Sequence, residues 1–414
     1  MVRLVIMLLV TTVVSGYYFP FGFFFLPDGI NTKMILAVIG AILFIYHRST
    51  KHQCDISKEL LVSIAISLVF SLLCLYSCEY NNTEDYAYAT YIISFFTWLG
   101  GAYTVCASIR AVHGEVTLKL LTGYLTFVCA CQCLLALLID RIPTFQLFVD
   151  TYINQGQAFF QEVGRLYGIG AALDTAGIRF SVCLLLIAYL LSENKEIRNN
   201  PKDIIFLLSC FFIISVIGNI ISRTTVIGTV AGVCYMICST RFSWKQNRTL
   251  YTIFGIGLVC TIALSVYFYV TDLSFHSNMR FAFEGFFNWA ETGEWRTDST
   301  DKLNREMWIW PQTTAGWIVG TGLFDNWIYG TDIGYCRFIL YSGLLGFSAF
   351  ASLFIYNAWS FSRKTAHFLL FSLLLLALSF IIWFKVATDL FFIYALFHCL
   401  DWERSKCENE IELA

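Results

Sequence analysis

The chain has 414 residues, of which 57% are apolar and 14% are charged, and its formal net charge is −2 at pH 7. Soluble globular domains carry about a quarter charged residues, so this composition excludes a soluble globular protein and predicts an integral membrane protein. The small net charge also gives no basis for expecting a nucleic-acid partner.

Apolar stretches recur along the whole chain. A helix needs about 20 mainly apolar residues to cross the hydrocarbon core of a bilayer. The sequence predicts about twelve spans, centred near Leu8–Phe24, Met34–Tyr46, Leu60–Leu75, Ala87–Ile109, Leu120–Leu138, Phe180–Leu191, Ile204–Ile221, Thr225–Cys238, Leu250–Val270, Phe338–Tyr356, Phe368–Phe384 and Val386–Leu400. We therefore expect an all-α integral membrane protein, with residues 1–414 forming a single polytopic domain.

Lysines and arginines gather in alternate gaps between these spans, and such gaps face the cytoplasm in most membrane proteins. The basic gaps carry Arg48/Lys51, Arg110/Lys119, Lys195/Arg198/Lys202, Arg241/Lys245/Arg248 and Arg363/Lys364, followed by Arg404/Lys406 in the C-terminal tail. This pattern predicts that both termini are cytoplasmic.

The cysteines fall mostly within spans and show no metal-ligand or redox spacing. We expect them to act as small buried hydrophobes. The sequence predicts no metal and no other cofactor.

Arginines stand at the predicted outer ends of the middle spans. Arg165 and Arg179 flank the glycine-rich segment before the sixth span, and Ser222-Arg223 forms the very short gap between the seventh and eighth. An arginine at the centre of a bilayer costs about 2.5–3.5 kcal/mol on insertion scales unless it snorkels or finds an anion. Because guanidinium groups match phosphate oxygens bidentately, the three arginines are candidate phosphate or diphosphate ligands, with Ser222 as a hydroxyl donor. Alternatively, they snorkel to lipid headgroups or pair with Asp174 and Glu162.

One long break in hydrophobicity, residues 271–337, separates the ninth and tenth spans. It predicts a periplasmic loop that is rich in arginine, aspartate and tryptophan. Arg305 lies in its middle, and Asp332, Tyr335 and Arg337 follow a glycine-rich stretch at its end. We expect this last set to present polar groups at the start of a helix.

The order of these motifs resembles the O-antigen polymerase and O-antigen ligase superfamily. The motifs are Gly164-Arg165, Ser222-Arg223, Arg305-x-x-Trp308, Gly320-x-Gly322, Asp332-x-Gly334-Tyr335 and Tyr341-x-Gly343-x-x-Gly346. These families are bacterial inner-membrane glycosyltransferases of the GT-C type that use undecaprenyl-pyrophosphate-linked glycans at the periplasmic face. The resemblance covers the architecture of the whole chain, whereas the motif residues lie only between Gly164 and Gly346.

The resemblance implies a glycosyltransferase, and one departure favours its polymerase branch. Ligases of this superfamily typically carry a catalytic histidine at the end of the long loop, where this chain has Asp332, and its only loop histidine, His276, lies far upstream. We therefore expect polymerisation of lipid-linked repeat units into O-antigen or capsular polysaccharide. The alternatives are an O-antigen ligase acting on lipid A core and a flippase for lipid-linked oligosaccharides.

The resemblance also implies roles for single residues in a metal-independent transfer. Arg165, Arg179, Ser222 and Arg223 would hold the diphosphate, and Arg305, Tyr335 and Arg337 would assist from the loop. Asp332 would act as a base or orienting group, or else cap the tenth span or pair with Arg337. The expected partners are the lipid-linked oligosaccharide and membrane lipids, and a chain-length regulator stays an open alternative.

Overall fold

The computed structural model describes residues 2–27, 29–51, 56–162, 164–239, 247–324, 329–365 and 367–402. It is 77% helical with almost no sheet, which confirms the all-α class. The predicted cytoplasmic residues Arg241, Lys245, Arg404 and Lys406 lie outside the described residues.

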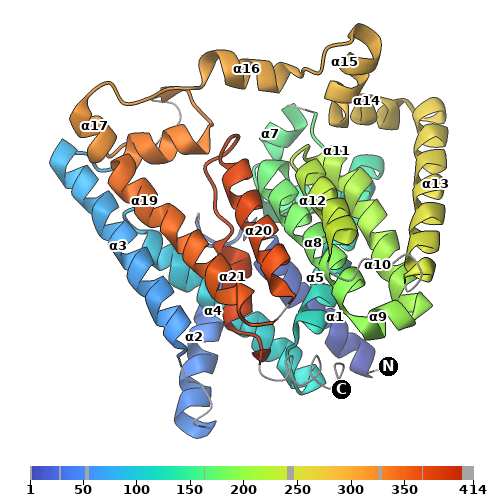
Figure 1. Cartoon of the computed structure of the whole chain (residues 1–414), viewed down its shortest axis with the longest axis horizontal. Helices are drawn as coiled ribbons and strands as arrows, with labels where there is room; N and C mark the ends of the chain where they lie inside the picture. The colour runs from blue at the N-terminus through green and yellow to red at the C-terminus, as the bar shows by residue number, and fades with distance from the viewer. Residues whose placement is uncertain are drawn as a thin grey trace. The chain divides into compact units, whose positions relative to one another are not determined.

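The chain forms two compact units, and each is described by itself (Figure 1). The first comprises residues 1–35, 107–295 and 401–414, and the second comprises residues 36–106 and 296–400. That residues 1–414 form a single polytopic domain stays a prediction. The boundary at Trp295 and Arg296 falls inside the predicted long loop, so the two halves of that loop belong to different units.

The first unit holds most of the central helices. Its elements are α1 (Val2–Tyr18), β1 (Gly22–Phe23), α5 (Leu118–Arg141), α6 (Pro143–Tyr152), β2 (Ile153–Asn154), α7 (Gln157–Glu162), α8 (Leu173–Glu193), α9 (Lys195–Asn199), α10 (Pro201–Ile213), the π-helical segment η1 (Ile214–Gly218), α11 (Asn219–Ile221), α12 (Thr225–Cys238), α13 (Arg248–Thr271), α14 (Leu273–Ala282) and α15 (Glu284–Thr292).

The second unit contains the last helices of the chain and part of the long loop. Its elements are α3 (Lys58–Asn81), α16 (Asp298–Glu306), α17 (Thr314–Ile318), α19 (Gly334–Ser362), α20 (Phe368–Ile382) and α21 (Phe391–His398). Two further helices, α2 (Thr32–Lys51) and α4 (Tyr91–His113), cross from one unit into the other.

Within the described residues, eight helices are long and apolar enough to cross a membrane. They are α2, α3, α4, α5, α8, the continuous stretch Pro201–Ile221, α13 and α19. The other four predicted spans coincide with α1, α12, α20 and α21, which are shorter. The structure supports a multi-pass membrane protein, but the predicted count of twelve spans is not confirmed.

Helices α8 and α12 lie side by side in the first unit because glycines let their backbones approach (Figure 1). A Cβ added at Gly228 would lie 2.1 Å from the Cα of Ser181, and one at Gly232 would lie 3.2 Å from the Leu184 carbonyl oxygen. Small residues four positions apart commonly form such interfaces in membranes. This packing holds the start of α12 against α8. It therefore also positions the turn before α12, which carries Arg223.

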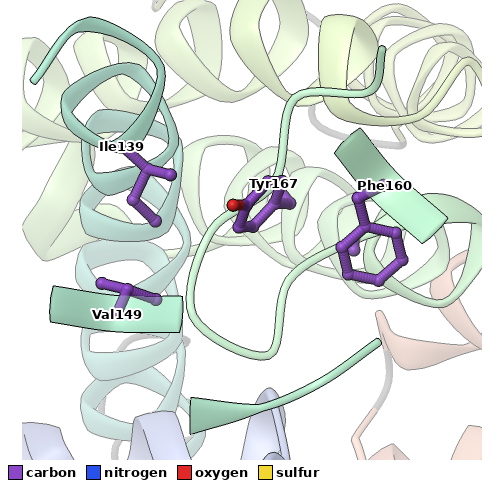
Figure 2. Packing of buried hydrophobic residues seen from close by; sticks show 5 residues of the cluster. Ile139, Val149, Phe160 and Tyr167 are labelled. Carbon is purple, nitrogen blue, oxygen red and sulfur yellow. The ribbon is translucent and has the colours of Figure 1, made fainter. Parts of the chain in front are cut away.

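The segment between α5 and α8 has its own small hydrophobic core. Ile139, Val149, Phe160, Tyr167 and Ala172 form a buried cluster (Figure 2). The Tyr167 hydroxyl also donates to Asp150, with oxygen–oxygen distances of 3.0 and 3.1 Å. These contacts hold α6, β2 and α7 together and give the segment a defined shape.

The helix ends of the first unit fall into two sets. At one end, Gly22 of β1 pairs with Asn154 of β2, which joins the connection after α1 to the connection after α5. At the other, Lys119 pairs with Glu196, and Arg110 pairs with Asp401 at 2.7 Å. The two sets match the alternate gaps predicted from the basic residues. Which set faces the cytoplasm stays a prediction.

In the second unit, α3 lies beside a kinked α19 (Figure 1). Gly343 interrupts α19 with φ 63°, ψ −174°, and an added Cβ there would lie 2.2 Å from the Ile318 carbonyl oxygen. Gly320 approaches the same kink, because its added Cβ would lie 2.3 Å from the Tyr341 carbonyl oxygen. The backbone N–H of Gly322 donates to that oxygen at 3.0 Å. The glycine motifs of the long loop and of α19 therefore meet at one packing junction.

Candidate functional site: an arginine pair on one aromatic ring

Arg223 lies in a tight turn between two helices of the first unit. The helix ends at Ile221 because Ser222 adopts an extended conformation with φ −152°, and α12 begins at Thr225. The Arg223 side chain is 18% exposed. A guanidinium in this position needs anionic or aromatic neighbours, because desolvation of an ion costs several kcal/mol.

The ring of Phe281 in α14 supplies one such neighbour to two arginines. The guanidinium carbons of Arg165 and Arg223 each lie 3.9 Å from the centroid of this ring. A cation–π contact contributes about 0.5–2 kcal/mol, depending on how far it is removed from water. Two such contacts offset only part of the cost of desolvating two arginines.

Glu284, at the start of α15, supplies the second neighbour of Arg223. Its carboxylate lies 2.7 Å from Nη2 of Arg223, and both side chains are less than one-fifth exposed. Within the described residues, the half-buried guanidinium of Arg165 forms neither an ion pair nor a hydrogen bond. The two arginines therefore share a ring but not a counterion.

The negative charge near Arg165 does not balance the effects of burial and of the neighbouring Arg223. Burial and the positive charge of Arg223 lower the pKa of Arg165, and Asp174 and Glu284 oppose this shift. The lowered pKa means that these surroundings disfavour the charged guanidinium. A bound anion would reverse this imbalance.

Asp174, in the first turn of α8, positions the turn that carries Arg223. It accepts hydrogen bonds from the hydroxyl of Thr224 at 2.6 Å and from that of Ser222 at 3.3 Å. Gly177, one helical turn further on, gives Ser222 room, because an added Cβ would lie 2.4 Å from the Ser222 oxygen. Ser222 is thus a buried structural contact of Asp174.

Arg179 lies elsewhere on α8. It is two residues beyond Gly177, and two residues correspond to about 200° around an α-helix, so it lies on nearly the opposite face. Its Nη1 donates to the Thr175 carbonyl at 2.7 Å. The structure brings Arg165 and Arg223 together but does not place Arg179 on their side of the helix.

The remaining predicted site residues belong to the second unit. Asp332 is exposed just before α19, whose N-cap residue is Ile333. The Tyr335 hydroxyl donates to the Phe380 carbonyl at 2.9 Å, which makes it a packing contact between helices. Arg337 donates through Nη2 to the Phe324 carbonyl at 2.7 Å, and its guanidinium lies 3.9 Å from the centroid of that ring. Arg305 is exposed near the end of α16.

Phe281 and Glu284 are the site residues that sequence reasoning missed. Both lie in the predicted periplasmic loop, residues 271–337. A carboxylate three residues after an aromatic residue, in a loop predicted to lie on the same side as Arg165 and Arg223, is the signal that could have indicated them. It became recognisable only when the fold placed α14 beside the α11–α12 turn.

No family model matches the chain, and no curated protein or solved structure matches it.

Proposed function

We propose that the chain polymerises undecaprenyl-pyrophosphate-linked oligosaccharide repeat units into O-antigen or capsular polysaccharide at the periplasmic face of a bacterial inner membrane. One observation carries this proposal. Arg165 and Arg223 share the Phe281 ring, and only Arg223 has a carboxylate partner within ion-pair distance. Two neighbouring guanidinium groups, of which only one has a carboxylate partner among the described residues, suit a diphosphate.

The transfer reaction creates negative charge where this arginine pair would act. An acceptor sugar hydroxyl attacks the anomeric carbon of the donor, and the bond from that carbon to the diphosphate oxygen breaks with its electron pair. Fixed cations that stabilise this departing charge lower the barrier without a metal. A single displacement of this kind inverts the anomeric configuration.

The proton of the attacking hydroxyl needs an acceptor. Asp332 is exposed at the start of α19, and we assign it this role within the proposal. Positioned carboxylates serve as general bases when a substrate brings the hydroxyl within hydrogen-bonding distance. Within the proposal, Arg305 and Arg337 keep the assisting role that the resemblance implies.

The experiment compares the surface glycans of cells that lack the protein with those of cells that carry a variant. Cells without a polymerase should display core bearing one repeat unit, whereas cells without a ligase should display bare core and retain polymer on the lipid carrier. We expect Arg165→Ala and Arg223→Ala each to reproduce the single-repeat phenotype at normal protein levels.

The matched control is Arg363→Ala. This arginine lies 3.8 Å from the centroid of the Trp359 ring, so it also makes a cation–π contact, but at the predicted cytoplasmic end of α19. It should leave polymer length unchanged. Normal polymer in the Arg165 variant would exclude the arginine pair as the diphosphate site, and bare core in the deletion strain would identify a ligase.

A further inference from the structure

The first unit contains a cavity of about 460 Å³, and none of its lining residues has a role in the proposed transfer. It lies between the connection from α1 to α2 and the segment that runs from β2 to the start of α8. Its size falls within the range of about 300–1,000 Å³ that is usual for small-molecule sites. The antiparallel pairing of β1 with β2 forms part of its wall.

The lining combines aromatic rings with neutral amides. Phe21, Phe23 and Phe160 contribute the rings, and Asn31, Asn154 and Gln155 contribute the amides. Among the described residues that line the cavity, none is charged. An amide both donates and accepts hydrogen bonds, as a hydroxyl group does. This lining therefore fits a neutral ligand that carries several hydroxyl groups and an apolar face.

Among the described residues, the side-chain amide of Gln155 forms a hydrogen bond through its oxygen but not through its nitrogen. Its Oε1 accepts from the backbone N–H of Gly170 at 2.6 Å. A flipped amide would place two donors against each other, so this contact fixes which atom is the oxygen. Nε2 is buried and has no hydrogen-bond partner in the described part of the chain. A buried donor without a partner is unfavourable. We therefore expect the Gln155 amide to turn towards the cavity when a ligand oxygen is bound there.

The cavity and the arginine pair share the same structural elements. Leu173 and Thr175 line the cavity, whereas Asp174 between them binds the hydroxyls beside Arg223. The backbone N–H of Arg165 donates at 2.8 Å to the carbonyl of Phe160, whose side chain lines the cavity. Leu173 also has a φ of 51°, a strained conformation for a residue with a side chain. A ligand that contacts Arg165 therefore has the cavity as its neighbour across one short loop.

From these observations we infer that the cavity binds a neutral sugar residue of the oligosaccharide whose diphosphate the arginine pair holds. This inference rests on the proposed function and adds a glycan-recognition site to it. A lipid tail would leave the Gln155 donor unsatisfied, and an anionic group would find no cation among the described lining residues. A hydroxyl of a sugar satisfies the donor, while the sugar's C–H face packs against a phenylalanine ring.

The test uses Gln155→Glu in the full-length protein in nanodiscs. Glutamate retains an acceptor for the Gly170 N–H and removes the donor, so the loop contact survives. The probe is the soluble oligosaccharide that mild acid releases from the lipid-linked material of cells lacking the protein. Saturation-transfer NMR should detect its binding to the wild type and show binding about tenfold weaker for the variant, as loss of one buried hydrogen bond predicts. Equal binding to both proteins would overturn the inference.

A second probe separates this inference from the proposed function. Undecaprenyl pyrophosphate without a glycan should bind the Gln155→Glu variant as tightly as the wild type, and it should bind Arg165→Ala weakly. One outcome would support the sugar cavity and refute the diphosphate site. In it, Gln155→Glu loses binding of the soluble glycan, whereas Arg165→Ala binds undecaprenyl pyrophosphate as tightly as the wild type. The exposed Gln312→Glu exchange is the matched control, which should bind both probes normally.

Discussion

Arg165 and Arg223 differ in what neutralises their charge. Glu284 lies at ion-pair distance from Arg223, whereas Arg165 has the Phe281 ring and only more distant carboxylates. Competition between Glu284 and a phosphate for Arg223 follows from this arrangement. A diphosphate that binds both arginines would weaken the contact of Glu284 with Arg223.

We predict that Glu284→Gln lowers the thermal stability of the protein without an anion and increases the stabilisation that added pyrophosphate gives. The first effect arises because removal of a carboxylate leaves two neighbouring guanidinium groups less compensated. The second arises because a ligand that binds the folded protein raises its melting temperature in proportion to the logarithm of its affinity. Thermal unfolding with and without pyrophosphate measures both.

Glu291→Gln is the control on the same helix. Glu291 pairs with Arg280 at 2.8 Å, and both side chains are more than two-fifths exposed. Exposed ion pairs contribute about 0–1 kcal/mol, so this exchange should change little. An equal response to pyrophosphate in both variants would show that Glu284 does not compete with the anion.

At the residue scale, the sequence predicted the arginines but not their neighbours. Arg223 was predictable because a charged residue in a turn between two apolar helices is costly without a partner. Its partners were not, because Phe281 and Glu284 follow a separate span and only tertiary packing brings them close. Tyr335 had the polarity expected of a site residue, yet its hydroxyl binds a helix carbonyl.

At the element scale, the position of Arg223 depends on the contact between α8 and the turn before α12. Ser181 connects the two, because its hydroxyl donates to the Thr224 carbonyl at 3.0 Å and accepts from the N–H of Gly228 at 3.2 Å. Gly177 makes the approach possible. The turn is therefore held by small residues that no larger side chain can replace without movement.

Gly177→Ala should lower the melting temperature and reduce polymer formation. The added Cβ would lie 2.4 Å from the Ser222 oxygen and 2.9 Å from the Thr224 Cβ. Overpacking typically costs about 1–3 kcal/mol, which exceeds the gain of about 0.5–1 kcal/mol from replacing a helical glycine by alanine. Thermal unfolding and the length of the glycan polymer measure the two effects.

Gly123→Ala in α5 isolates the helix-propensity contribution, because nothing lies within 4 Å of an added Cβ there. This variant should be as stable as the wild type or slightly more so. If Gly177→Ala behaved in the same way, the close packing of α8 against the turn would not be the constraint that we infer.

Asp272 links α14 to the end of α5. It accepts from the N–H of Phe275 at 2.8 Å and binds Arg141 with distances of 2.6 and 2.9 Å. The Arg141 guanidinium, with help from that backbone N–H, lowers the pKa of Asp272 to about 2. Since α14 carries Phe281, this link helps to position the Phe281 ring against Arg165 and Arg223.

The pH dependence of this link has a definite sign. A carboxyl group whose pKa is lower in the folded protein than its ordinary value of about 3.9 stabilises the fold at pH values above about 4. The stabilisation is lost as the pH falls towards 2. We predict that the melting temperature of the wild type exceeds that of Asp272→Asn at pH 7 and that the difference closes between pH 4 and pH 2. A difference that persists at pH 2 would contradict the ionic contribution.

The helices were largely predictable from the sequence, whereas their lengths were not. Every predicted apolar stretch contains a helix, because such segments in a bilayer must satisfy their backbone groups internally. The stretch Val386–Leu400 contains only the short helix α21, and Asp389 accepts from the N–H of Phe391, its first residue, at 2.8 Å. Local hydrogen bonds of this kind are not visible in a hydropathy pattern.

At the scale of the whole molecule, the predicted long loop is divided between the two compact units. Its first half forms α14 and α15 of the first unit and supplies Phe281 and Glu284, whereas its second half belongs to the second unit with Arg305 and Asp332. The sequence predicted a loop whose later residues face the arginines. The described contacts to the arginines come from its earlier residues, and the role of the later residues stays a prediction.

The sequence could not predict this division. Both halves have similar aromatic and charged compositions, and the boundary at Trp295 and Arg296 depends on which helices each half packs against. The alternation of basic and non-basic gaps was easier to predict, because it follows from a general charge asymmetry. Contacts within the first unit group its helix ends in the same two sets.

The most direct test of the proposed chemistry is polymer formation by the purified protein. Wild-type protein in nanodiscs, incubated with the lipid-linked repeat unit, should produce a ladder of products that differ by one repeat. Arg165→Ala, folded to the same melting temperature within a few degrees, should produce none, and Arg363→Ala should match the wild type. A ladder from Arg165→Ala equal to that of the wild type would contradict the central claim that this arginine pair holds the departing diphosphate.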